Sequence, residues 1–445
     1  MSKIKKMMPL LLVLAYVLSA YYMIDAKITT EREYQVLVRQ AQEYASEEIL
    51  TDALKSYQQA LSMKPSVDLS LEVGDMYLQA GDYYSAKKWY DNQLLTKYPN
   101  EAGTYEFGIA LSLRQGRYAQ AYDCYDQFQK RKLVSENVEQ LMDQIRYSFE
   151  LVERFDDVSV FSNATKTAAV QQDGLWGFVD TSGSRKIDFN YETADVFSNT
   201  TAVKDQSGGV YYIDSKGNKK ISASQIEKVN PDFGTIREMQ SIESGKILAS
   251  NGSDWCYFDE TSYQKLFGPF SNATKITNGV GAVCDEQGKW ALISDNGELL
   301  TEYMFDGVIA DQKGIVCRTD AVVVEQGGRF YLVDHNGNRI GEEGYSDIRA
   351  FNDGTLAAAK KGSKWLFLDD QGIEHQLGDF EEAQSFSNGL AAVKKEGTWG
   401  YIDTNGVLVI NNQFSEVSPF GPDGVAFVKG TGTTWNLLRL YRDNH

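Results

Sequence analysis

Apolar and aromatic positions recur with two different periods along this chain. From about residue 30 to residue 153 they recur at helical spacing, with Tyr and small residues on the same predicted helix faces. From Phe155 onward, short runs alternate between apolar and polar positions, which is the period of β-strands. The pattern therefore predicts α and β structure in separate domains, a helical domain at 30–153 and an all-β domain at 155–445.

An uncharged apolar run precedes both domains, from Met7 to Ile24, and the tail at 1–6 before it carries Lys3, Lys5 and Lys6. Eighteen helical residues cover roughly 27 Å, close to the thickness of the hydrocarbon core of a bilayer. The run predicts a transmembrane signal anchor at 7–24, with the basic tail in the cytoplasm and the bulk of the chain extracytoplasmic. The predicted localisation is a single-pass membrane protein of the cell envelope; a cleaved signal peptide is the alternative.

The helical region repeats one pattern about three times. A small residue and a Tyr share one helix, a Gly-led turn follows, and a second helix carries Ala and Tyr, as in "VGDMYLQAGDYYSAKKWYDNQLLTKYP" at 73–99. This region resembles the tetratricopeptide repeat family, and the resemblance implies a short superhelix whose concave face holds a peptide or another protein. The segment 135–155 is expected to be a capping helix. The positions that carry the pattern are Ala53, Tyr57, Gly74, Tyr77, Ala86, Tyr90, Ala121 and Tyr125.

The β-region repeats a unit about eight times, at spacings of 34 to 45 residues. Each unit divides into four short strands, which favours a β-propeller, in which closure removes free sheet edges; an open β-solenoid is the alternative. An aromatic anchor marks the same place in nearly every unit, and Val210 takes that place in the second. The aromatic anchors are Trp176, Trp255, Trp290, Phe330, Trp365, Trp399 and Trp435.

A turn motif, Asp followed three residues later by Gly, comes after the anchor strand in five units. The Asp accepts hydrogen bonds from turn amides, and the Gly adopts a positive φ. A calcium loop needs several oxygen ligands in one segment, so we expect these turns to be structural. The turn residues are Asp180 and Gly183, Asp214 and Gly217, Asp334 and Gly337, Asp369 and Gly372, and Asp403 and Gly406.

The anchor Trp is followed by Gly at Trp176-Gly177 and Trp399-Gly400, and on this pair the β-region resembles the bacterial WG-repeat family. Other units depart from the pair, as at Trp255-Cys256. The resemblance implies an architecture more than a function. A second signature, an aromatic residue followed by small polar residues, marks the passage between units and is expected to place the Phe between sheets. Its Phe residues are Phe161, Phe197, Phe270, Phe351, Phe386 and Phe420.

Composition narrows the function. The formal net charge is -18, and without a concentrated basic patch such a chain repels phosphate backbones, so nucleic acid is not expected as a partner. Phosphate-binding loops, zinc-helix motifs and nucleophile elbows do not occur in the sequence. The four cysteines are scattered and are expected to be unpaired packing residues. We therefore predict no catalytic residue, cofactor or metal.

These observations predict a non-enzymatic, membrane-anchored extracytoplasmic scaffold that binds a protein or peptide partner through its helical repeats and its β-domain. One alternative is a carbohydrate- or cell-wall-binding module, in which the recurrent Trp and Tyr rings stack on sugars. A second alternative is a cryptic glycoside hydrolase, because a pair of catalytic carboxylates needs no fixed spacing in sequence.

Overall fold

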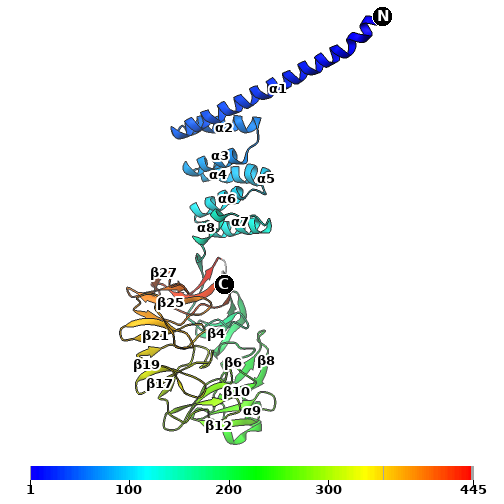
Figure 1. Cartoon of the computed structure of the whole chain (residues 1–445). Helices are drawn as coiled ribbons and strands as arrows, with labels where there is room; N and C mark the ends of the chain where they lie inside the picture. Colours follow the sequence, from blue (N-terminus) through cyan, green and yellow to red (C-terminus); the bar gives the residue numbers. More distant parts are fainter. Residues whose placement is uncertain (1, 354, 442–445) are drawn as a thin grey trace. The chain divides into compact units, whose positions relative to one another are not determined.

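The computed structural model describes residues 2–353 and 355–441; the side chains of residues 2–15, 24, 26 and 342 lie outside the described set. The chain divides into two compact domains, the helical domain, Met1–Arg146, and the β-domain, Tyr147–His445. The β-domain thus begins before residue 155, where the change of period placed it. The two domains are built from different secondary structure (Figure 1).

The helical domain consists of helix hairpins joined by short turns (Figure 1). Gly81 and Gly116 adopt φ values of 70° and 65° in the second and third hairpin turns, a backbone conformation that side chains with a Cβ disfavour. The Asp82 side chain then caps the next helix by accepting a 3.0 Å hydrogen bond from the amide of Ser85. The helices are α1 Ser2–Ser46, α2 Leu50–Met63, α3 Val67–Gln79, α4 Tyr83–Trp89, the π-helix η1 Tyr90–Leu94, α5 Leu95–Lys97, α6 Ala102–Arg114, α7 Tyr118–Lys130 and α8 Glu136–Asp143.

Glycine and aromatic residues pack against one another between successive hairpins. A Cβ on Gly74 would lie 2.6 Å from the Phe107 ring, and a Cβ on Gly108 would lie 2.5 Å from the Tyr90 ring. The repeat positions Ala53, Ala86 and Ala121 are fully buried, as are most of Tyr57 and Tyr90, whereas Tyr77 and Tyr125 are partly buried. Small residues thus let the aromatic rings of the neighbouring hairpin reach the helix backbone.

The expected capping helix at 135–155 is wrong in its second half. α8 ends at Asp143, and the strand β1, Phe149–Phe155, follows. The helical spacing of apolar residues in this segment is overridden by tertiary packing, because Phe149 and Phe155 enter the hydrophobic core of the β-domain.

The apolar run at 7–24 lies within α1, which continues without interruption into a charged segment and packs through Tyr34 and Ala41 against α2. Among the residues that the structure describes, no helix has both the length and the apolar character needed to cross a membrane. The predicted transmembrane helix is therefore wrong, and the single-pass localisation that followed from it is wrong as well.

The described strands of the β-domain form seven antiparallel sheets. One of these sheets has seven strands and spans two repeats, because β5 pairs with β4 along most of its length and with β6 through its last residues. Eight repeats result. Repeats 1 and 2 share β2 Asp157–Val158, β3 Thr167–Gln172, β4 Leu175–Asp180, β5 Arg185–Ala194, β6 Thr201–Asp205, β7 Val210–Ile213 and β8 Lys219–Ser222, and α9 Ala223–Val229 and the 3-10 helix η2 Pro231–Phe233 follow.

The next repeats have three or four strands each, and a two-residue strand begins each of them. Repeat 3 contains β9 Glu238–Met239, β10 Lys246–Ser250, β11 Trp255–Asp259 and β12 Lys265–Phe270; repeat 4 contains β13 Asn272–Ala273, β14 Val280–Cys284 and β15 Trp290–Ser294; repeat 5 contains β16 Gly307–Val308, β17 Val322–Gln326, β18 Arg329–Val333 and β19 Arg339–Tyr345. Repeat 6 contains β20 Asp347–Ile348, β21 Ala357–Lys361, β22 Lys364–Leu368 and β23 Glu374–His375; repeat 7 contains β24 Glu382–Ala383, β25 Leu390–Lys395, β26 Thr398–Asp403 and β27 Leu408–Phe414.

Repeat 8 is completed by the first strand of the domain. It contains β28 Glu416–Val417, the 3-10 helix η3 Pro422–Gly424, β29 Val425–Lys429 and β30 Trp435–Leu440. Strand β1 pairs antiparallel with β30, from Phe149 opposite Leu440 to Phe155 opposite Trp435. The two ends of the β-domain therefore belong to one sheet (Figure 1).

Each interface between successive repeats has its own hydrophobic cluster. A further cluster joins Phe161 and Val170 of repeat 1 to Phe427 of repeat 8. The Phe161 and Phe427 rings stack with their centroids 5.0 Å apart. The repeats therefore form a closed ring, the arrangement of a β-propeller, whereas an open solenoid would leave repeats 1 and 8 apart.

The glycine of the Trp-Gly pair lies against the backbone of the next strand. A Cβ on Gly400 would lie 2.4 Å from the carbonyl oxygen of Ile410 and 2.8 Å from the amide nitrogen of Asn412. Gly177 has the same environment, since its Cβ would lie 2.8 Å from the carbonyl oxygen of Ile187. Backbone atoms cannot yield as a flexible side chain can, so a side chain at these positions must displace a strand.

We predict that Gly400→Ala lowers the free energy of unfolding by about 1–3 kcal/mol, because the methyl group overpacks the strand interface. The matched control is Gly430→Ala, where a Cβ would have no atom within 4 Å, and its effect should stay within about 0.5 kcal/mol. Urea denaturation followed by tryptophan fluorescence measures both. Equal stabilities of the two variants would contradict the close packing of Gly400.

Candidate functional site

The Asp-Gly motifs form closed turns. In each, one Asp oxygen accepts hydrogen bonds from the amides two and four residues later, as Asp403 Oδ1 does from Asn405 and Val407, both at 2.9 Å. The Gly has φ near 80° and donates its amide to the Asp carbonyl, as Gly406 does to Asp403 at 3.0 Å. The same geometry holds at the other predicted turns, Asp180 with Gly183, Asp214 with Gly217, Asp334 with Gly337, and Asp369 with Gly372.

These turn carboxylates are occupied by the backbone of their own turn. No group of three or more His, Cys, Asp or Glu side chains that could hold a metal ion occurs in the part of the chain that the structure describes. Asp205, Asp285 and Asp311 make the same two amide contacts in turns that were not predicted. The first two carry out the same structural task between other strands, whereas Asp311 does so at a different place in the ring.

The aromatic anchors begin the same strand of each repeat and pack across the sheet. In six repeats a second aromatic residue, 15 positions later or supplied by β1, is paired opposite the anchor. Trp365 and Trp399 are only 3% and 7% exposed, and the others are partly buried. The pairs are Trp176 with Tyr191, Trp255 with Phe270, Trp290 with Phe305, Phe330 with Tyr345, Trp399 with Phe414, and Trp435 with Phe155.

The inter-repeat Phe signature holds at five of its six positions, where the side chain is buried: Phe161, Phe197, Phe351, Phe386 and Phe420. Phe270 is a correction, because it ends β12 and pairs with Trp255 instead of entering the turn between repeats. The turn residue there is Ile276, which is 1% exposed. The Ser-Asn that follows Phe270 is a coincidence of sequence, since the chain passes into β13 at that point.

The four cysteines are buried and unpaired. Burial raises the pKa of Cys124, Cys256 and Cys317 to about 11 in each case. A thiol with a raised pKa is a poor nucleophile at neutral pH, which agrees with their role as packing residues.

A groove in the helical domain lies between α3, α6 and α8 and has a volume of about 350 Å³. Its apolar lining includes Leu71, Phe107 and Leu141. Glu106 accepts hydrogen bonds from Ser135 and Asn137, which ties the start of α8 to α6 and fixes this side of the groove. Polar side chains of α8, among them Gln140 and Gln144, complete the lining.

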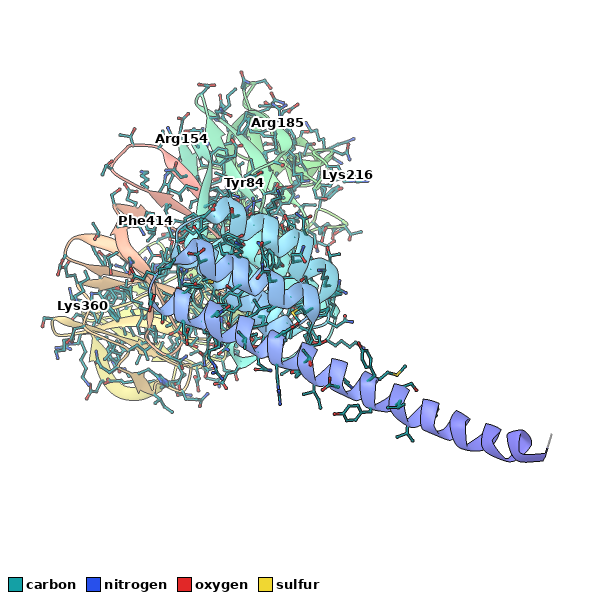
Figure 2. All side chains as sticks on the ribbon, turned by 90° about the horizontal axis from the view of Figure 1, so that it is seen from above. Tyr84, Arg154, Arg185, Lys216, Lys360 and Phe414 are labelled. Atoms are coloured by element: carbon teal, nitrogen blue, oxygen red, sulfur yellow. The ribbon has the colours of Figure 1, made fainter. Side chains whose placement is uncertain are left out.

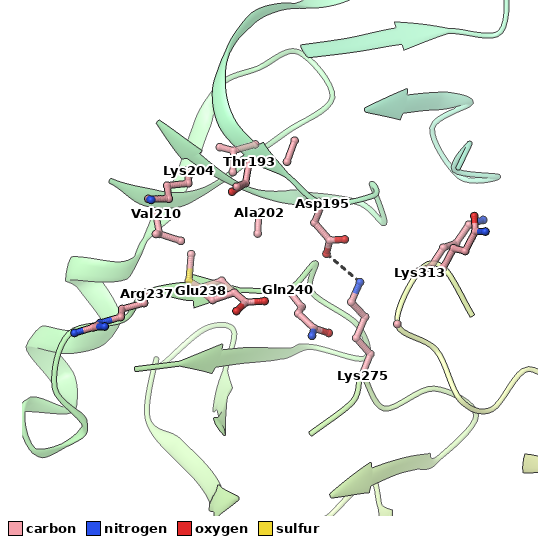
Figure 3. Close-up of a pocket in the computed structure, with 15 residues that line it drawn as sticks. Thr193, Asp195, Ala202, Lys204, Val210, Arg237, Glu238, Gln240, Lys275 and Lys313 are labelled. Atoms are coloured by element: carbon pink, nitrogen blue, oxygen red, sulfur yellow. Dashed lines mark hydrogen bonds and ion pairs between the residues drawn. The ribbon is translucent and has the colours of Figure 1, made fainter. Parts of the chain in front are cut away.

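A second cavity, of about 530 Å³, lies within the β-domain and is lined by repeats 2, 3, 4 and 5 (Figure 3). A dashed line in Figure 3 marks the 3.0 Å ion pair between Lys275 Nζ and Asp195 Oδ2. The same Asp195 oxygen accepts hydrogen bonds from the backbone amide and the hydroxyl of Ser241, both at 2.7 Å. Lys275 is 4% exposed, so its charge is held by a carboxylate that three donors fix in place.

Repeat 5 departs from the others at the centre of the ring. Where most repeats place a buried Phe or Ile, repeat 5 has Asp311, whose side chain is 3% exposed and forms an ion pair with Arg318. The Asp311 turn carries Gln312 and Lys313, which line both the cavity of repeats 2–5 and a small neighbouring one lined by repeats 1, 6, 7 and 8. Gln312 and Lys313 therefore lie where the repeats of the ring converge.

Lys313 is partly buried. Burial, with Arg318 and Lys275 nearby, lowers the pKa of its ammonium to about 8 despite the opposing charges of Asp311 and Glu243. The sequence gave one usable signal for this residue: the buried Phe or Ile of the other turns is missing from "IADQKG" at 309–314. Asp195 and Lys275 carried no such signal, because only the folding of the ring brings residues 80 positions apart together.

The sequence of the β-domain matches the WG containing repeat family at residues 344–365, 378–399 and 399–430. This match supports the WG-repeat part of the resemblance and lies outside the helical domain, whose assignment as tetratricopeptide repeats stays a prediction. A search of curated proteins finds no match.

Three solved structures resemble part of the chain. The computationally designed Ika8 protein has 13% identity and a TM-score of 0.43, covering 65% of this chain and 98% of its own. BamB from Moraxella catarrhalis has 9% identity and a TM-score of 0.40, covering 65% and 99%. PorZ, a surface component of the type-IX secretion system of Porphyromonas gingivalis, has 12% identity and a TM-score of 0.33, covering 63% and 42%. Likenesses at this level carry no argument about function.

The turn carboxylates predict a dependence of stability on acid. Hydrogen bonds from the Ser207 side chain and the Gly209 amide lower the pKa of Asp205, and hydrogen bonds from the Asn218 side chain and amide lower the pKa of Asp214. A lowered folded-state pKa contributes stability above the ordinary pKa of Asp, near 4, and this contribution is lost as the pH falls toward the folded-state value.

We predict that the double variant Asp205→Asn and Asp214→Asn, which keeps the amide acceptors but removes the titration, loses stability less steeply than the wild type below about pH 4. Urea denaturation midpoints across this pH range measure the slope. The exposed residue Asp379 serves for a matched Asp379→Asn control. Identical slopes for the double variant and the wild type would contradict the effect of the turns.

Lys313 predicts the opposite sign. Its pKa is lowered on folding, so the protonated ammonium destabilises the folded state below about pH 8, and this penalty disappears as the pH rises from there toward about 10.5, the ordinary value. Lys313→Met should therefore raise the free energy of unfolding at pH 7 by roughly 1–3 kcal/mol and have a smaller effect near pH 10. Lys364→Met, at a side chain that is 69% exposed, is the control. A Lys313→Met variant that is less stable than the wild type at pH 7 would contradict the predicted penalty.

Proposed function

We propose that this protein is a non-enzymatic interaction scaffold, and that its helical domain binds an extended peptide segment of a partner protein in the groove between α3, α6 and α8. The observation that carries the proposal is the groove itself, which has an apolar floor and a polar rim. Such a surface suits a chain segment with alternating side chains, because apolar groups enter the floor while the peptide backbone and polar groups meet the rim.

The charges of the groove narrow the kind of peptide. Asp75 of α3 and Glu106 of α6 both line it, and its α8 side contributes uncharged amides. A segment with a Lys or Arg next to apolar residues complements this lining better than an acidic one. The tetratricopeptide resemblance, which implies a peptide-binding concave face, supports the same proposal.

The β-domain contributes a rigid body to this scaffold. Its closed ring and its turns account for the repeated Trp, Gly and Asp residues through packing and hydrogen bonding, so they need no catalytic explanation. Carbohydrate binding and glycoside hydrolysis stay untested predictions, and the partly buried, paired anchors do not favour the first of them.

The test is selection of peptides from a random display library against the immobilised full chain. Peptides enriched on the wild type should bind with micromolar affinity in titration. They should lose at least about tenfold, roughly 1.4 kcal/mol, with Ala110→Arg, which places a bulky cation in the groove. Tyr84→Ala is the matched control, because Tyr84 of α4, labelled in Figure 2, is 79% exposed and does not line the groove.

Peptides that bind Ala110→Arg and the wild type equally would place the binding surface elsewhere. A library that yields no specific peptide with the wild type would contradict peptide binding by the helical domain. Circular dichroism of Ala110→Arg should match the wild type, so that a loss of binding is not a loss of fold.

A further inference from the structure

The cavity of repeats 2–5 carries a local charge opposite to that of the chain. Its charged lining consists of four cations and two carboxylates, a balance of +2, whereas the chain has a formal net charge of -18. A positive cavity in a negative protein concentrates anions from solution. The cations are Lys204, Arg237, Lys275 and Lys313, and the carboxylates are Asp195 and Glu238.

Two of these cations are already compensated. Lys275 is paired with Asp195, and Lys204 lies 2.9 Å from Glu192. Arg237 and Lys313 form no ion pair with any residue in the described parts of the chain. Of these two, Arg237 is exposed to solvent, but Lys313 is partly buried, so the Lys313 ammonium has lost water without gaining a carboxylate.

The chain holds Lys313 in this position through a braced turn. The Asp311 carboxylate accepts the amides of Lys313 and Ile315, at 2.8 and 3.0 Å, and also binds the Arg318 guanidinium. Ile315 then forms a parallel bridge with Lys275 of repeat 4. The nearest carboxylate, Asp311, is thus committed to other donors and does not neutralise Lys313.

A second unsatisfied group lies on the same wall. Gln240 lines the cavity, and its buried side-chain oxygen has no hydrogen-bond partner among the described residues. Gly314, the residue after Lys313, lies against this amide, since a Cβ there would be 3.3 Å from Gln240 Oε1. The two ends of a side-chain amide interchange by rotation, so Gln240 offers an N–H donor next to the turn.

We propose that this cavity binds a small anion, and that the carboxylate or phosphate oxygens of the ligand lie against the Lys313 ammonium and within reach of the Gln240 amide (Figure 3). The volume, about 530 Å³, is in the range of small-molecule sites. The site lies within the β-domain, so the proposal is independent of peptide binding in the helical groove. The anion supplies the counter-charge that the described chain withholds from Lys313.

The groups that face Lys313 give the site a proton signature. They are Arg318 and Lys275, which disfavour its charge, and Asp311 and Glu243, which favour it. An anion bound at Lys313 adds a further favourable charge and raises its pKa. Binding at about pH 8.5, where most of the free site is neutral, should therefore be accompanied by proton uptake.

The experiment is isothermal titration of the full chain with inorganic phosphate and, separately, with succinate, at about pH 8.5 in two buffers of different ionisation enthalpy. We expect a dissociation constant at or below about 1 mM for at least one probe, together with uptake of a fraction of a proton. Binding of phosphate alone assigns the site to phosphorylated ligands, and binding of succinate alone assigns it to carboxylates.

Two variants of the site and one control make the result specific. Lys313→Gln should weaken binding at least tenfold and abolish proton uptake, whereas Lys313→Arg should retain binding without proton uptake, because Arg does not titrate here. Lys364→Gln, at an exposed lysine outside the cavity, should bind as the wild type does. Thermal denaturation of Lys313→Gln checks that the variant is folded.

Three outcomes would overturn the proposal: no binding of either probe up to about 10 mM, equal binding by Lys313→Gln and the wild type, or binding without proton uptake. Loss of binding in Lys364→Gln would also count against it, since it would indicate an unspecific effect of surface charge.

Discussion

The pairing of β1 with β30 is the contact on which the β-domain depends. Every repeat buries one face against the next, and a linear array would leave the faces of repeats 1 and 8 in water. Phe155 closes the array by pairing opposite Trp435, and the cluster of Phe161 and Phe427 fills the last interface. The aromatic partner that every other anchor receives from its own repeat thus comes to Trp435 from the start of the domain.

Closure also determines what lies at the centre. It brings the first strands of the repeats together, and most of them contribute a buried Phe or Ile to the turn that follows. Repeat 5 instead contributes Asp311, and this single change turns Lys313 into the centre of the ring. Around it, Asp195 and Lys275 compensate each other, and a charged cavity remains in a domain otherwise held together by apolar interfaces. The peripheral residues Arg185, Lys216 and Lys360, labelled in Figure 2, lie on the outer side of the same ring.

Local chemistry explains what could be predicted from sequence. The Asp-Gly turns depend on contacts within five residues, so Asp403 and Gly406 could be identified without the fold. The strand at 149–155 was predicted as helix because its pairing partner lies at the far end of the domain, and the membrane helix was inferred from composition alone. The cavity residues Asp195, Lys275 and Lys313 come from three repeats, and no local pattern joins them; only the missing Phe in repeat 5 pointed to that segment.

Hydrogen exchange of the full chain, measured by mass spectrometry, tests ring closure most directly. Leu151 lies in β1 opposite Leu438 and is half exposed, so Leu151→Pro disrupts the strand without removing a buried side chain, and Leu151→Ala is its control. Closure predicts that Leu151→Pro accelerates exchange in β30 and across the interface of repeats 1 and 8, and lowers protection in the remaining repeats, whereas Leu151→Ala resembles the wild type. If β1 alone exchanged faster and every other repeat kept wild-type protection, the ring would not depend on this pairing.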